Sequence, residues 1–200
     1  DLFGVASAVE AAQAIRPGVS VPELALPLAR HYFANGEQGK SLPLYQAALA
    51  AAPDTVPEIV YEVAQAYDDV GDCRRALVHY ERYRSMLRRW QRGEVNWKIG
   101  NCSLQLAREL RDERAYEEAL VHVDRMIELG EPRNLLAQAW FERGELLSAL
   151  GRCDEAMEAF GRVREVSQAE SNPLVERAQW RYDELRFVAP SGGVLVAGGC

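Results

Sequence analysis

The stretch that decides the fold is Leu135 to Val166, LLAQAWFERGELLSALGRCDEAMEAFGRVREV. An earlier stretch, Val56 to Leu87, reads VPEIVYEVAQAYDDVGDCRRALVHYERYRSML. The two stretches register without a gap at six positions, which pair Ala64 with Gly144, Tyr67 with Leu147, Gly71 with Gly151, Cys73 with Cys153, Ala76 with Ala156 and Tyr80 with Phe160. Repetition of this kind indicates a structural unit that buries its apolar face by stacking on copies of itself.

Two further copies of the pattern are present. The copy at residues 21–55 contains Gly36 and Tyr45, and a fourth copy contains Ala119 in its second helix. The first helix of the fourth copy allows two registers. In the preferred register Gly100 is its small residue, and the extra residues from Arg108 to Arg114 lengthen the helix pair by about two turns. In the alternative register Ala107 is the small residue, and the extra residues fall between units.

The pattern resembles the tetratricopeptide repeat, a family of helix-turn-helix units of about 34 residues. The residues that carry the resemblance are Trp140, Gly144, Gly151, Ala156 and Phe160. The resemblance implies an all-α fold, a right-handed α-solenoid of about four helix hairpins with a C-terminal capping helix. The expected parts are an N-terminal helix at 1–20 that could be half of an incomplete repeat, an array at 21–171 with units 21–55, 56–92, 93–134 and 135–171, a capping helix at 172–187 and a Gly-rich tail at 188–200.

The capping helix is predicted from its first residues and from its apolar stripe. Asn172 is a suitable N-cap, and Pro173 suits the first helical position. The stripe that we expect to face the last repeat consists of Leu174, Ala178, Tyr182 and Leu185.

Composition and motifs argue against several functional classes. The chain has 30 acidic and 23 basic side chains and a formal charge of -7, which disfavours nucleic acid as a partner. It has no apolar run long enough for a transmembrane segment. Because no catalytic or nucleotide-binding motif is found and His31, His79 and His122 suit surface or packing roles, we expect no enzyme activity, cofactor or metal site.

In tetratricopeptide proteins the first helices line a groove that takes a segment of a partner. The resemblance therefore implies a set of partner-binding residues at groove positions, together with Trp180 of the capping helix. The set consists of Leu26, Arg30, Tyr61, Gln65, Asp68, Trp97, Asn101, Phe141, Glu145 and Trp180. In the alternative reading Tyr61, Trp97 and Phe141 pack between neighbouring helices.

The expected partner is a protein or peptide segment with apolar or basic side chains. Asp68, Asp69, Glu94 and Glu145 would repel a carboxylate, so the carboxylate-binding groove of the chaperone-binding subgroup is not expected. Trp180 lies off the apolar stripe and marks a second candidate surface. A basic strip, Tyr80 to Arg92, is either a docking surface or a face paired with nearby acidic residues.

The four cysteines allow one disulfide hypothesis. Cys73 opens a second helix and Cys102 lies in the next first helix, so a Cys73–Cys102 bond is conceivable in an oxidising compartment. Otherwise both are small buried thiols. Cys153 repeats the position of Cys73, and Cys200 ends a tail that we expect to be flexible or docked on a partner.

These observations lead to a non-catalytic scaffold or adaptor that binds a protein partner, within a larger assembly. The alternatives are a regulatory peptide-sensing array and the adaptor region of a larger enzyme. With Lys at only two positions, Lys40 and Lys98, and many alanines, the composition is compatible with a bacterial source. The periplasm or outer membrane and the cytoplasm both stay open as compartments, and so do the oligomeric state and the partner.

Overall fold

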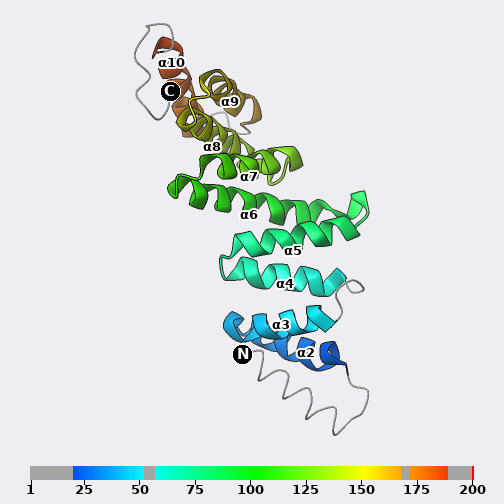
Figure 1. Ribbon diagram of the computed structural model, residues 1–200. Helices are drawn as coiled ribbons and strands as arrows, with labels where there is room; N and C mark the ends of the chain where they lie inside the picture. The colour runs from blue at the N-terminus through cyan, green and yellow to red at the C-terminus, as the bar shows by residue number, and fades with distance from the viewer. Residues whose placement is uncertain (1–19, 52–56, 168–171, 189–199) are drawn as a thin grey trace. The chain divides into compact units, whose positions relative to one another are not determined.

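The computed structural model describes residues 20–51, 57–167, 172–188 and 200, and its regular elements are helices (Figure 1). The all-α fold expected from the sequence is therefore confirmed. The predicted N-terminal helix lies outside the described residues except for Ser20, and the predicted tail does so except for Val188 and Cys200. The chain divides into two compact units, residues 1–95 and 96–200.

The first unit contains two helix pairs. Helix α2, Val21–Ala34, packs against α3, Gln38–Ala51, and α4, Pro57–Asp69, packs against α5, Cys73–Met86. Helix α3 also packs against α4, and a short 3-10 helix, η1, follows at Arg89–Gln91. Ser20 starts α2 with a capping box, and Asp72 caps α5 by accepting a hydrogen bond from a backbone N–H.

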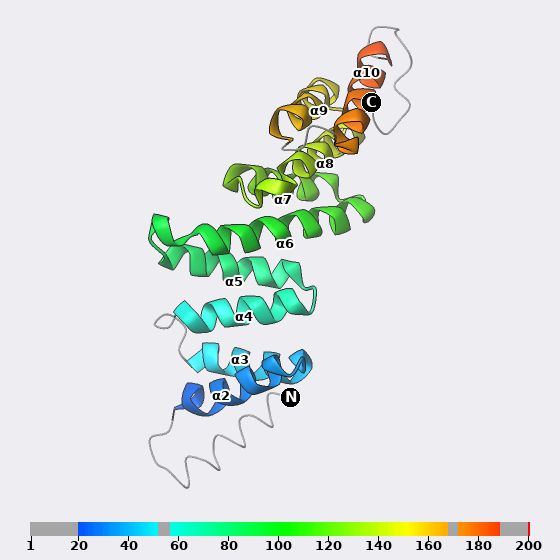
Figure 2. The same cartoon turned by 180° about the vertical axis from the view of Figure 1, so that it is seen from behind.

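The second unit contains the remaining helices, apart from the first residues of α6 (Figure 2). Helix α6 spans Gly93–Asp112 and is followed by α7, Tyr116–Leu129, and by a short 3-10 helix, η2, at Arg133–Leu135. Helix α8, Leu136–Ala149, packs against α7 and against α9, Cys153–Val166. The last helix, α10, Pro173–Val188, packs against α9 and α8, and so occupies the place of the predicted capping helix.

The same buried positions recur in every pair. One small residue in each first helix is followed after 12 positions by a second small residue, and after 16 by a larger one. These sets are Ala29, Ala64, Ala107 and Gly144; then Ser41, Ala76, Ala119 and Ala156; then Tyr45, Tyr80, Val123 and Phe160; all but Gly144 are at most 2% exposed and Gly144 is also buried. At Gly144 a Cβ atom would lie 2.6 Å from the ring of Phe160, so the close approach of α8 and α9 requires glycine there.

The turn between the paired helices has the same geometry in each pair. Its left-handed residue comes seven positions after the small residue: Gly36, Gly71, Arg114 and Gly151, with φ of 73°, 78°, 63° and 74°. The N–H of the next residue bonds to the carbonyl four positions before the left-handed residue, as from Ala115 to Leu110. Arg114 follows Ala107 by seven positions, so the structure contradicts the register based on Gly100 and supports the one based on Ala107.

Gly100 has a different neighbour. A Cβ atom there would lie 1.8 Å from the carbonyl oxygen of Glu131 and 2.9 Å from Cδ of Pro132. The small residue is therefore needed where α6 passes the connection between α7 and α8. The extra length lies at the start of α6, which has 20 residues where α8 has 14, and not at Arg108 to Arg114.

None of the helices among the described residues combines the length and the apolar character that crossing a membrane requires.

Replacing Arg114 by Gly tests the register of the third pair. A side chain costs roughly 1 kcal/mol in the left-handed conformation that Gly adopts freely, so Arg114→Gly should raise the free energy of unfolding by about 1 kcal/mol. Gly71→Arg, at the equivalent turn, should lower it by a similar amount. Urea denaturation followed by circular dichroism measures both changes. Destabilisation by Arg114→Gly would show that this turn does not follow the repeat.

Candidate protein-interaction surface

With the register fixed, the expected groove residues take defined places in the first helices. They lie three positions before and one position after the small residue, as Tyr61 and Gln65 do in α4 around Ala64. In α6 these places belong to Leu104 and Arg108. Trp97 and Asn101, which were assigned from Gly100, lie instead in the N-terminal half of α6, and that assignment is corrected.

Ion pairs connect successive first helices at a repeated position. In α2, α6 and α8 the residue after the small residue pairs with a side chain of the next first helix or, for α8, of α10. In the first unit Arg30 donates to both carboxylate oxygens of Glu62, at 2.7 Å for the closest pair. In the second unit Glu142, two positions before Gly144, lies between Arg108 at 3.5 Å and Arg111. Glu142 is buried, so its two arginines offset the cost of desolvating its charge.

The last connection reverses the charges. Glu145 of α8 accepts a hydrogen bond of 2.7 Å from Arg181 of α10. The Cζ atom of Arg177, one turn earlier in α10, lies 4.8 Å from the ring centroid of Phe141. Phe141 is only 6% exposed and meets the ring of Phe160 edge-on, at 5.5 Å. Phe141 and Glu145 thus join α8 to α10. Phe141 therefore packs between neighbouring helices, which was the alternative to a partner-binding role.

Tyr61 is engaged in a comparable way in the first unit. Its ring centroid lies 4.8 Å from that of Tyr83 and 5.8 Å from that of Tyr80, and its hydroxyl donates to Glu94. Burial, followed by the hydrogen bond to Glu94, raises the pKa of Tyr61. Tyr80 donates to Asp68 at 2.9 Å. The edge of this cluster is acidic, with Glu94 exposed and Asp68 half-buried. Leu26 and Gln65 lie half-buried on their helices.

Large apolar side chains are exposed elsewhere. Trp180 is 65% exposed and Phe187 is 74% exposed, and both lie on α10. On the same helix Ala178 and Leu185 are only 1% exposed. A separation of seven residues places Trp180 and Phe187 on the same side of a helix, two turns apart. We call this pair the α10 face. Trp97 is 46% exposed, and Trp90 of the basic strip is 77% exposed.

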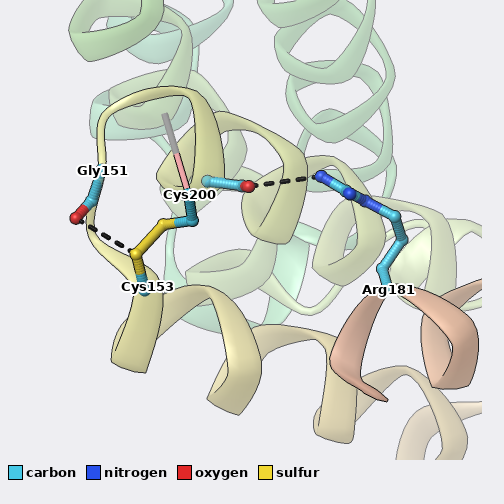
Figure 3. The surroundings of a disulfide bond; sticks show 5 residues. Gly151, Cys153, Arg181 and Cys200 are labelled. Atoms are coloured by element: carbon cyan, nitrogen blue, oxygen red, sulfur yellow. Dashed lines mark hydrogen bonds between the residues drawn. A yellow bond between two sulfur atoms is a disulfide. The ribbon is translucent and has the colours of Figure 1, made fainter. Parts of the chain in front are cut away.

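The structure corrects the cysteine hypothesis. Cys73 and Cys102 are not joined by a disulfide, and both are buried. A disulfide joins Cys153 to Cys200 instead, with Cα atoms 5.7 Å apart (Figure 3). The pairing across 47 positions brings the end of the chain to the turn between α8 and α9.

His79 has the packing role expected for a histidine of this array. Its ring stacks on Tyr67 at 5.6 Å with an interplanar angle of 4°. Burial lowers its pKa, and the neighbouring charge of Arg82 lowers it further. The neutral form of His79 is therefore favoured in the folded chain.

Comparisons with known proteins support the fold but do not identify a function. No family model matches the chain, and no curated protein matches it. Among solved structures it is similar to apo RapI, with 14% identity over 84% of this chain and 64% of RapI, at a TM-score of 0.50. It also resembles MamA from Desulfovibrio magneticus RS-1 (14% identity, 87% and 98% covered, TM-score 0.46) and the TPR-like repeats of a Podosopora anserina kinesin light chain (17% identity, 82% and 85% covered, TM-score 0.44).

Titration of Tyr45 tests the network around Glu62. Burial and the nearby charge of Glu62 raise the pKa of Tyr45 to about 12, from 10.0. Between these values the unfolded chain loses the phenol proton first, so the free energy of unfolding should fall by about 2 kcal/mol as the pH rises from 10 to 12. Tyr45→Phe has no phenol proton to lose at this position. Its free energy of unfolding, measured by urea denaturation, should therefore decline less steeply over that range. Parallel declines in both proteins would contradict the assignment.

Proposed function

Because the chain has the tetratricopeptide-repeat fold, we propose that it is a non-catalytic scaffold that binds a protein partner through the α10 face. The observation that carries the proposal is the exposure of Trp180 and Phe187 on a helix whose other side is buried. Large exposed aromatic side chains grouped on one face mark interaction sites, since their burial supplies much of the binding free energy.

The α10 face is favoured over the predicted groove because the groove aromatics are already engaged. Phe141 is buried beneath Arg177, and Tyr61 is packed against Tyr83. The acidic edge formed by Tyr61, Glu94 and Asp68 stays a second proposed contact, and it would attract basic side chains. The proposed partner therefore presents apolar side chains to α10, and basic ones to the edge if it extends that far.

We also propose an oxidising compartment as the working location. A disulfide such as Cys153–Cys200 persists outside the reducing cytosol. Of the two locations left open by the bacterial composition, the periplasm or outer membrane suits the disulfide better. Assembly of an envelope complex is then a fitting role for such a scaffold.

Capture of the partner tests the proposal. The intact chain, Trp180→Ala and Trp90→Ala are used as baits in a native extract, and the bound proteins are identified and quantified by mass spectrometry. Loss of a tryptophan at a binding hot spot costs about 2 to 4 kcal/mol, or roughly 30-fold to 1,000-fold in affinity. A stoichiometric partner should be lost with Trp180→Ala and retained with Trp90→Ala, the matched exposed tryptophan.

Other outcomes would indicate a different binding site or a different function. Loss with Trp90→Ala alone would place the partner on the basic strip. Equal capture by all three baits would remove both tryptophans from the interface. Capture of no protein would favour the peptide-sensing array or the adaptor region of a larger enzyme.

A further inference from the structure

Helix α10 is held on the second unit by few buried side chains. Only Ala178 and Leu185 are almost fully buried among its described residues. Leu174 and Tyr182 of the same helix are half-buried, and two arginines add contacts with α8. Arg177 covers the ring of Phe141, and Arg181 bonds to Glu145 and, at 3.2 Å, to the hydroxyl of Ser148. Partly exposed contacts of this kind are weak singly, so a further restraint adds to the stability of the docked helix.

The disulfide supplies a restraint at the right place. Cys153 is the first residue of α9, and the backbone N–H of Cys200 donates to the carbonyl oxygen of Ser148 at 2.9 Å. Ser148 thus meets both Cys200 and Arg181. The bond closes a covalent ring that contains all of α9 and α10. Closing a ring limits the positions open to a detached helix, and so favours its docked position.

The disulfide is also open to exchange. Cys153 and Cys200 are both half-exposed, whereas the thiols of Cys73 and Cys102 are buried. The sulfur of Cys153 lies 3.5 Å from the carbonyl oxygen of Gly151, so a thiol formed there would have an acceptor in place. Access for an attacking thiolate is one of the factors that govern exchange.

We infer that the Cys153–Cys200 disulfide is a redox-sensitive clamp that holds α10 on α8 and α9. A dithiol reductant attacks one sulfur, forms a mixed disulfide, and is then released as its own disulfide. Cys153 and Cys200 take up the two protons as thiols, and the S–S bond is lost. Helix α10 then leaves its docked position more often, which uncovers Phe141, Glu145 and Ser148 of α8. Reduction therefore exposes a further face of the second unit.

Amide hydrogen exchange with mass spectrometry tests the clamp on the full chain. Peptides from α10 are compared in the oxidised chain, after dithiothreitol, and in Cys153→Ser. Loss of the ring should speed exchange in α10 by about 100-fold, with a smaller increase in α8. Peptides from α2 to α5 should not change. Dithiothreitol should have no further effect on Cys153→Ser, and Cys73→Ser should behave as the parent chain does.

Three results would overturn the inference. Equal protection of α10 in the oxidised and reduced chains would show that the disulfide does not hold the helix. A uniform increase throughout α7, α8, α9 and α10 would make the bond a general support of the unit. Four free thiols in the chain trapped by alkylation in its native extract would show that the bond does not form there. None of these readouts depends on a partner, so the proposed function is tested separately.

Discussion

The close approach of paired helices at one small residue is the constraint on which the rest of the fold depends. At Gly144 even a methyl group would clash with the ring of Phe160. Three alanines occupy the equivalent place in the other first helices, and each is almost fully buried. The approach fixes which side of each helix faces its partner, and the left-handed turn seven positions later fixes where the second helix begins.

That constraint also explains which parts of the fold could be predicted. Glycine marks the turn in three pairs, so their registers follow from the sequence. In the third pair Arg114 adopts the left-handed conformation and gives no such signal, while Gly100 draws attention to the wrong place. Gly100 is small because a connection between two other helices passes it. Ala107 lies 12 positions before Ala119, the same spacing as in the other pairs, and this spacing was the better guide.

The contacts of single side chains were harder to predict. The sequence predicts groove positions in the first helices, yet Phe141 and Glu145 join α8 to α10, and Arg30 joins α2 to α4. A helical pattern shows which residues share a face, but it does not show what the next helix places opposite. The Cys153–Cys200 bond was missed for a related reason, since a pairing across 47 positions depends on where the chain returns.

The arrangement gives the two sides of α10 separate roles. One side packs against α8, where Arg177 lies over the ring of Phe141 and Arg181 bonds to the carboxylate of Glu145. The other side carries Trp180 and Phe187, whose exposure contributes nothing evident to the stability of the unit. Apolar exposure of this extent opposes solubility, and a binding partner that covers it supplies a physical reason for it.

The most direct test of the central claim is a footprint of the bound partner. Amide hydrogen exchange of the oxidised chain is measured alone and in complex with the captured partner. We expect added protection in α10, strongest between Trp180 and Phe187, with α3 and α7 unchanged. Protection confined to α4 and α5, with α10 unaffected, would contradict this claim.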